Sequence, residues 1–131
     1  MTPQRQANVD QALGMLAELA TGQLNRSRFV EDASWWSNMG QSFSLDAFQG
    51  LLDMLHAATI GGLVTQAGQI IAQDDLVVIE ATSDVPLVSG GRYANRYLFL
   101  IHFDGGLIRQ VREYNDTAHV IQSFGLGSEL D

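Results

Sequence analysis

Residues 93–116 read YANRYLFLIHFDGGLIRQVREYND, and this stretch decides the fold. It contains two apolar runs, Tyr93–Phe103 and Leu107–Tyr114, separated by Asp104-Gly105-Gly106. Runs rich in aromatic and β-branched residues are typical of strands, and a short Asp/Gly connection is typical of a hairpin turn. The stretch therefore predicts an antiparallel β-hairpin.

Two further strands are expected before this hairpin. They are Leu63–Ala72 and Leu76–Val85, with turns at Gln73-Asp74-Asp75 and at Ser89-Gly90-Gly91. The apolar pattern in this part of the chain has a period of two, which is typical of strands with one buried face. Short turns join strands to their chain neighbours, so we expect an antiparallel sheet.

The first half of the chain has helical periodicity instead. From Pro3 to about Thr21, apolar residues recur at three- and four-residue steps, and Gly22 is a typical helix stop. A second helix is expected between the N-cap residue Ser44 and Gly61-Gly62. Arg28–Asn38 has little periodicity and is expected to pass from a short helix into a strand. Helices before strands predict one α+β domain over residues 1–131.

Composition excludes several functional classes. The 131 residues include 15 acidic and 7 basic side chains, and a net charge of −8 opposes nucleic-acid binding. The absence of cysteine excludes disulfides and thiolate metal sites, and it fits a reducing cytoplasm. No apolar run is long enough to cross a bilayer. We therefore expect a cytoplasmic protein that binds neither nucleic acid nor membrane.

The end of the chain resembles a known superfamily. The residues that carry the resemblance are Tyr93-x-Asn95-x-Tyr97, Asp104-Gly105-Gly106-Leu107-Ile108 and Arg112-Glu113-Tyr114-x-Asp116. They are similar to the SnoaL-like and ketosteroid-isomerase-like branch of the nuclear transport factor 2-like superfamily. The resemblance implies a curved antiparallel sheet wrapped by the N-terminal helices into a cone with an internal cavity. Members include isomerases, polyketide cyclases, epoxide hydrolases, dehydratases and non-catalytic proteins, so the activity stays open.

Glu113 is the leading candidate for chemistry. It shares one face of the last expected strand with Val111, and a bulge near Arg109 would bring Ile108 to the same face. A carboxylate in so apolar a strand is costly to bury without a partner, which makes it a candidate functional group. The alternative is a solvent-exposed Glu113 paired with Arg96 or Arg112.

Glu80 is a second candidate catalytic residue. Strand parity alone points it outward, because the opposite face of Leu76–Val85 is the more apolar one. An inward Glu80 opposite Glu113 would place two carboxylates in one cavity, which would raise the pKa of one and create an acid/base pair. Both orientations stay open at this point.

Six more residues are candidates for substrate binding. They are Trp35, Trp36, His56, Asn95, Tyr97 and Val111. One tryptophan is expected to line the pocket, where a flat aromatic surface suits a ring-shaped ligand, and burial in the core is the alternative. Asn95 and Tyr97 share the pocket face of their strand, although Tyr97 could serve packing alone. His56 could reach the cavity from the second helix or lie at the surface.

The sequence lacks some of the residues that known mechanisms in this superfamily use. At the position of the ketosteroid isomerase base, the chain has Trp36, Ser37 and Asn38, none of which takes a proton at neutral pH. The strand that matches the Arg and Asp of limonene-epoxide-hydrolase-like enzymes contains no arginine. Polyketide-cyclase-like members use an acid near the end of the final strand, which Glu113 or Asp116 supplies.

We therefore expect a small-molecule enzyme or binding protein in which Glu113 is a general acid/base. The reaction would be an isomerisation, cyclisation or hydration of an apolar, ring-like or carbonyl-bearing substrate. The alternative is a non-catalytic ligand-binding or dimerisation module. No cofactor and no metal are expected, since no two histidines have ligand spacing with a carboxylate. Leu98 and Leu100 on the outer face of the sheet suggest a homodimer.

Overall fold

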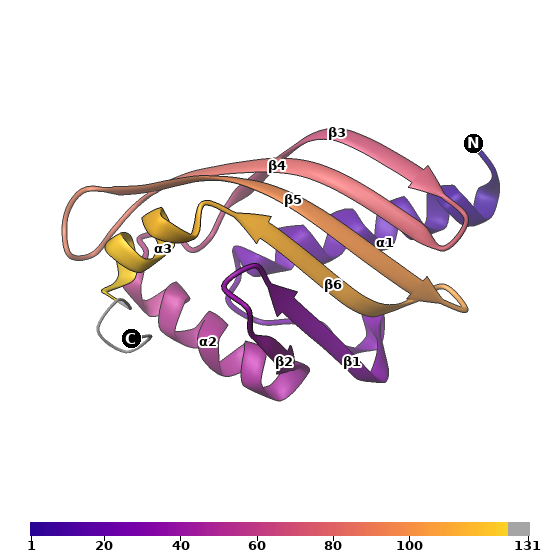
Figure 1. The fold of residues 1–131 in the computed structure, drawn as a ribbon, viewed down its shortest axis with the longest axis horizontal. Coiled ribbons are helices and arrows are strands. Elements are labelled where there is room, and N and C mark those ends of the chain that lie inside the picture. Colours follow the sequence, from indigo (N-terminus) through magenta and orange to yellow (C-terminus); the bar gives the residue numbers. More distant parts are fainter. Residues whose placement is uncertain (126–131) are drawn as a thin grey trace.

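The computed structural model describes residues 1–125 as helices packed on a single six-stranded sheet (Figure 1). In chain order the elements are α1 (Pro3–Leu19), η1 (Arg26–Arg28), β1 (Phe29–Ser37), β2 (Ser42–Ser44), α2 (Leu45–Ala58), β3 (Thr65–Gln73), β4 (Leu76–Pro86), β5 (Arg92–Asp104), β6 (Leu107–Asn115) and α3 (Thr117–Phe124). The strand order is β2-β1-β6-β5-β4-β3. The predicted α+β class, with a curved sheet, is confirmed.

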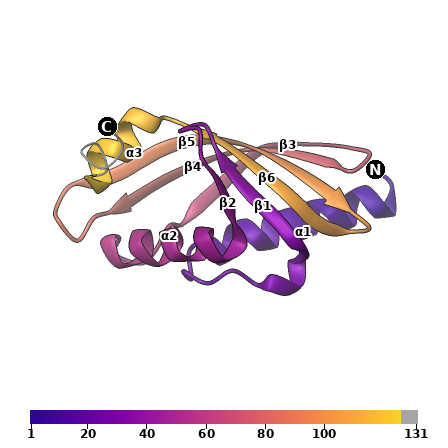
Figure 2. The ribbon, with the colours of Figure 1, turned by 60° about the horizontal axis from the view of Figure 1, so that its bottom comes forward.

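The two long helices lie on the same face of the bent sheet (Figure 2). α1 packs against β3, β4 and β6, and α2 packs against β1 and β2. The core lies between these layers and is built from large, fully buried side chains such as Trp35, Phe99, Met15, Leu52 and Ile79. The helices thus cover the inner face of the sheet and leave the outer face uncovered within the described residues.

Local sequence explains where both long helices begin. The Thr2 hydroxyl accepts a hydrogen bond from the Arg5 amide at 3.2 Å, and Pro3 occupies the first turn, where its missing N–H costs nothing. The Ser44 hydroxyl likewise accepts from the Ala47 amide at 3.1 Å, as predicted for an N-cap. α2 then ends at Ala58, three residues before Gly61.

The strand β1 pairs with β6 in parallel, whereas every other pair in the sheet is antiparallel. The expectation of an antiparallel sheet is therefore wrong for this one pair. The hairpin argument covers only strands joined by short turns, and β1 reaches β6 from the far end of the chain. Two short elements were also not predicted, namely β2 and α3. Asp116 begins α3, since its carboxylate accepts from the His119 amide at 3.2 Å.

A bulge at Arg109 sets which side chains of β6 face inward. Phe103 pairs with Ile108 and His102 pairs with Gln110, so Arg109 has no partner in the ladder. The extra residue lets Ile108 and Val111 both point into the core, where each is fully buried. The predicted bulge is confirmed, and it places the Glu113 side chain on the inner face with Val111.

We expect two adjacent glycines to respond very differently to the same substitution. Gly61 and Gly62 both have φ near +84°, at +85° and +83°, so Ala at either site should cost about 1 kcal/mol of backbone strain. At Gly62 the new Cβ would also overlap the carbonyl oxygen of Ala20, whereas at Gly61 it would meet nothing within 4 Å. Chemical denaturation should show Gly62→Ala to be clearly the more destabilising. Equal losses of unfolding free energy would contradict this packing argument.

Candidate functional site

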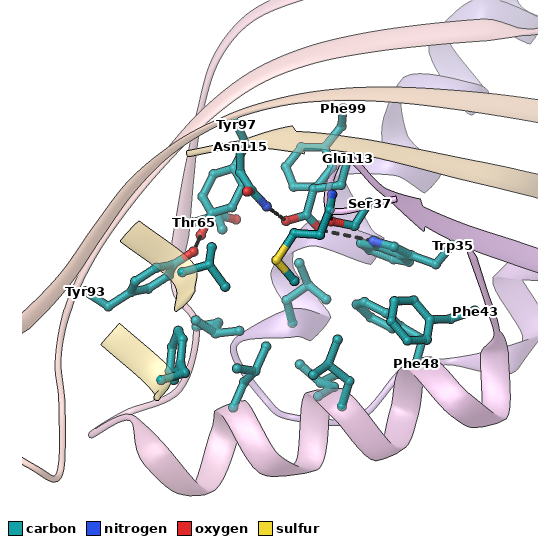
Figure 3. Close-up of a pocket in the computed structure, with 18 residues that line it drawn as sticks. Trp35, Ser37, Phe43, Phe48, Thr65, Tyr93, Tyr97, Phe99, Glu113 and Asn115 are labelled. Atoms are coloured by element: carbon teal, nitrogen blue, oxygen red, sulfur yellow. Dashed lines mark hydrogen bonds between the residues drawn. The ribbon is translucent and has the colours of Figure 1, made fainter. Parts of the chain in front are cut away.

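A pocket lies between the inner face of the sheet and α2, with α3 at one end (Figure 3). Its cavity volume is about 70 Å³, enough for a few water molecules. α2 supplies an apolar wall of Phe48, Leu51, Leu52 and Leu55. The polar residues of the lining are Ser37, Thr65, Tyr93, Tyr97, Glu113 and Asn115. The pocket is therefore mostly apolar, with a few polar groups that converge on it from the sheet.

Glu113 is the one carboxyl group among the described lining residues. Trp35 Nε1 donates a hydrogen bond to Glu113 Oε1 at 3.0 Å, and Asn115 Nδ2 donates to Oε2 at 2.6 Å. Removal from water raises the pKa of Glu113, and the two hydrogen bonds act in the opposite direction because they stabilise the charged form. The structure thus places Glu113 inside the pocket and not in solvent beside an arginine.

The two donors to Glu113 are held by different means. Trp35 is fully buried and stacks on Phe48, with ring centroids 3.9 Å apart and planes 12° from parallel. Asn115 is fixed through its backbone, because Asn38 Nδ2 donates to the Asn115 carbonyl at 3.0 Å and Asn38 Oδ1 accepts from the Asn115 amide at 3.3 Å. Packing and backbone hydrogen bonds therefore position the carboxylate before any ligand arrives.

A second polar cluster lies at the α3 end of the pocket (Figure 3). Tyr97 Oη contacts Ser83 Oγ at 2.9 Å and donates to Tyr93 Oη at 3.0 Å. Asn95 Nδ2 also donates to Tyr93 Oη, at 2.9 Å. Burial raises the pKa of Tyr97 to about 12 and also raises that of Tyr93, so both phenols keep their protons at neutral pH.

The orientation of the Asn95 amide is fixed by backbone donors. Its Oδ1 accepts from the Arg96 amide at 2.8 Å and from the Asp116 amide at 3.0 Å, so Nδ2 must face Tyr93. Tyr93 Oη therefore accepts two hydrogen bonds, and its own proton remains available. Because Tyr93 lines the pocket, this proton can be donated to a ligand.

Comparison with solved structures shows the same architecture in other proteins. No family model and no curated protein matches the sequence. A Jannaschia sp. CCS1 protein provisionally named a SnoaL-like polyketide cyclase has a TM-score of 0.79 at 16% identity, with 95% of each chain covered. An LEH-like epoxide hydrolase of M. tuberculosis has a TM-score of 0.75 at 15% identity over 97% of this chain and 96% of that one. An NTF2-like protein of unknown function from Burkholderia pseudomallei has a TM-score of 0.70 at 15% identity, with 90% and 97% covered.

This chain has the SnoaL-like, nuclear transport factor 2-like fold. The resemblance found in residues 93–116 is thereby confirmed for the architecture. At identities of 15–16% the likeness concerns the fold, and it does not select among the cyclases, isomerases and hydrolases that share it.

Of the predicted binding residues, Trp35 and Tyr97 line the pocket of this SnoaL-like fold. Trp36 points the other way, because successive strand residues alternate, and its ring lies under the Arg112 guanidinium at 4.0 Å. Asn95 lies behind Tyr93 and orients it, and Val111 is buried in the core outside the pocket lining. The expectation that one tryptophan faces the pocket holds, and the placement of Trp36, Asn95 and Val111 in its wall is wrong.

Two other candidates also lie elsewhere. Glu80 is exposed on the outer face of the sheet, in an open hollow with Gln66 and Arg96, so it forms no carboxylate pair with Glu113. Strand parity already pointed it outward, and the structure follows parity. The His56 ring packs beside Gly22 and Gly62, because the residue after Leu55 is turned by about 100° around the helix axis. Neither residue lines the pocket.

Sequence reasoning missed Tyr93 and Asn115 as pocket residues, although the signal was present. Asn115 has the same strand parity as Glu113, and Tyr93 has the same parity as Tyr97. Ser37 also lines the pocket and has the same strand parity as Trp35. Met39 and Phe43 line it too, and their loop and three-residue strand have no periodicity to follow. Within residues 1–125 no group of three His, Asp or Glu side chains is placed to hold a metal, and no helix is long and apolar enough to cross a membrane.

Replacing Glu113 by Gln should change the pH dependence of stability. The pKa of Glu113 is raised above the ordinary value of 4.5, so the folded protein holds this proton more tightly than the unfolded chain. Stability linked to this group is therefore present below that ordinary value and is lost as pH rises through the raised one. Relative to wild type, Glu113→Gln should thus gain stability in denaturation experiments as pH rises above 4.5. A difference that does not vary with pH would contradict the desolvated carboxyl.

Proposed function

We propose that the pocket binds a small, apolar, ring-containing molecule and that Glu113 acts on it as a general acid/base. The observation that carries the proposal is a single carboxyl group with a raised pKa, held by two side-chain donors inside a mostly apolar pocket. A general base works best when its pKa lies near the working pH, and an apolar surround moves a glutamate in that direction. The known enzymes that share this fold suggest only the general type of reaction for this proposal.

The two polar clusters suggest how the reaction would proceed on a carbonyl compound. Glu113 removes a proton from the carbon next to the carbonyl, and the electron pair left behind moves onto the carbonyl oxygen as an enolate. The free proton of Tyr93 is then available to hydrogen-bond that oxygen, where charge develops. Glu113 returns the proton at the same carbon, which gives exchange, or at another carbon, which gives isomerisation. In a ring closure the enolate carbon instead attacks a second carbonyl carbon of the same molecule, and the oxygen of that carbonyl takes the proton back from Glu113. Neither route needs an added cofactor.

Pocket size limits the ligand. A cavity of about 70 Å³ is smaller than the roughly 300 Å³ of typical ligand sites, so a ring-sized ligand requires the wall to move. Met39 and Phe124 lie on short segments next to the pocket, and both side chains are only partly buried. These two residues are the parts of the wall with most freedom to make room.

Glu113→Gln should abolish turnover while leaving ligand binding nearly intact. A Gln side chain keeps the shape and the hydrogen bond from Trp35 but cannot take a proton, so a loss of at least about 100-fold is expected. The assay is deuterium uptake from D₂O next to the carbonyl of small cyclic ketones, followed by NMR, with binding followed by thermal shift. Glu80→Gln makes the same substitution on the outer face and should leave the rate unchanged. Equal rates in wild type and Glu113→Gln would refute the catalytic role and leave a ligand-binding module.

We further propose that a second copy of the chain covers the outer face of the sheet. Leu98 and Tyr114 pair across β5 and β6 and are 40% and 36% exposed, and Trp36 stacks near Tyr114 with ring centroids 5.2 Å apart. Arg112 and Glu80 lie on the same face, so a two-fold axis can bring opposite charges together. This face offers one continuous apolar patch with both signs of charge around it.

Light scattering should therefore give twice the mass of one chain. Leu98→Glu places a charge within the patch and should shift the protein toward the monomer. Val88→Glu is a matched control, because Val88 is 65% exposed but lies in the turn between β4 and β5, away from the patch. A monomeric wild type, or a Leu98→Glu variant as dimeric as the control, would reject this interface.

A further inference from the structure

The Asn115 side chain uses one end of its amide and leaves the other end unpaired. Nδ2 donates to Glu113 Oε2 at 2.6 Å, and Oδ1 is buried with no hydrogen-bond partner among the residues that the structure describes. A buried acceptor without a partner is rare, because it loses its hydrogen bonds to water without replacement. Asn115 lines the pocket, so this unpaired atom belongs to a residue of the site.

Trp35 and Asn115, the two donors to Glu113, differ in which protonation states of the carboxyl group they can serve. An indole N–H can only donate, so Glu113 Oε1 remains an acceptor from Trp35 whether or not the carboxyl group is protonated. The proton of a neutral Glu113 therefore belongs on Oε2, the atom that faces Asn115. An amide can donate through Nδ2 or accept through Oδ1, so Asn115 can serve either state of Oε2.

A half-turn of the Asn115 amide would match a protonated Glu113. If Oε2 carried a proton while Nδ2 kept its place, two donor groups would face each other across the 2.6 Å that separates these two atoms. After rotation, Oδ1 accepts the O–H of Glu113, and 2.6 Å is an ordinary length for such a bond. The rotation breaks no other side-chain bond, because Asn38 holds only the backbone of Asn115.

Asn95 provides a natural contrast within the same site. Its Oδ1 accepts from two backbone amides, and its Nδ2 donates to Tyr93 and to the Asp116 carbonyl. Turning this amide would place its N–H groups against two backbone N–H donors and its oxygen against the Asp116 carbonyl oxygen. The Asn95 amide is therefore locked, whereas the Asn115 amide is free to respond to its one partner.

We propose that Asn115 is a positioning residue whose amide turns over when Glu113 gains a proton. With ionised Glu113 the pocket faces an acceptor, Oδ1, and with neutral Glu113 it faces a donor, Nδ2. The catalytic consequence rests on the proposed function of Glu113. The substrate proton moves to Oε2, its electron pair stays on the substrate as an oxyanion, and the turned amide then offers an N–H to that charge. Return of the proton restores both groups.

This pairing also narrows the ligand class. Before proton transfer, the ligand group beside Asn115 should donate to Oδ1, as a hydroxyl, an enol or a bound water does. After transfer, it should accept from Nδ2, as the oxygen of the same hydroxyl or water does, or as an enolate oxygen does. A ring ligand that carries a hydroxyl group near its reacting carbon satisfies both states, whereas a pure hydrocarbon satisfies neither.

The titratable groups that face Glu113 are few. From β5 these are the phenols of Tyr93 and Tyr97, which stay neutral near pH 7. The described lining residues from α1, α2, β1, β3 and α3 carry no charged side chain. Arg112 lies on the outer face, against Trp36. A pH-dependent change at Asn115 would therefore report on Glu113.

Neutron diffraction from deuterated crystals tests the proposal, since deuterium atoms are seen directly. The data are collected about two pH units below and above the Glu113 midpoint, which is measured first by carbon NMR of its carboxyl group. We expect Nδ2 to face Oε2 at high pH, and Oδ1 to face a deuterated Oε2 at low pH. Asn95 should keep one orientation in both crystals. The same Asn115 orientation at both values of pH would overturn the proposal.

Solution NMR gives a second measurement that needs no crystal. The side-chain amide signals of Asn115 should change with the same midpoint as the Glu113 carboxyl group, and those of Asn95 should not change. In Glu113→Gln the Asn115 signals should be constant with pH, because no proton is gained. In Trp35→Phe both midpoints should move upward together. An Asn115 signal that ignores the titration of Glu113 would contradict the coupling.

Neither measurement depends on turnover, so the two proposals can fail separately. Full activity in Glu113→Gln would remove the catalytic role of Glu113 and leave the amide result standing. A fixed Asn115 amide, together with an inactive Glu113→Gln, would keep the catalytic role and remove the inference about Asn115.

Discussion

The hydrogen bond from Trp35 to Glu113 connects a fully buried core residue to the carboxyl group of the pocket. The two residues are 78 positions apart in the chain and lie on β1 and β6, the parallel strand pair at the centre of the site. Because Trp35 is fully buried and stacks on Phe48, its N–H keeps one position and holds the Glu113 carboxylate in the wall of a mostly apolar pocket. The same packing thus has two effects on Glu113. It removes the carboxyl group from water, which raises its pKa, and it supplies the hydrogen bond that lowers the cost of burying the charged form.

The polar groups of the site fall into locked and free classes. Asn95 and Tyr97 are committed at both ends by hydrogen bonds within the protein, and Trp35 can donate in only one direction. The proton of Tyr93 and the Oδ1 atom of Asn115 are among the groups left over. A pocket with a spare donor, a spare acceptor and a carboxyl group is equipped to recognise a polar pattern on a mostly apolar molecule.

Much of this arrangement could be predicted from strand parity. The period of two placed Tyr97 inward on β5 and Glu113 inward on β6, and it required a bulge at Arg109, which the pairing confirms. The same rule pointed Glu80 outward, where it lies. Errors arose where a residue was assigned to the pocket because it was inward-facing, as with Val111 and Asn95. Inward-facing residues divide between core and cavity according to which helix lies opposite, and parity contains no information on that point.

The sequence by itself determined the two long helices, the four strands β3 to β6, the bulge and the parity of the side chains along β4, β5 and β6, because these follow from local periodicity, capping and turn chemistry. Only the tertiary structure decided that β1 lies parallel to β6, that Trp35 and Asn38 meet residues 113–115, and that His56 turns away from the pocket. Each of these depends on contacts between segments far apart in the chain. Such contacts are selected by the packing of the whole core, and no local pattern specifies them.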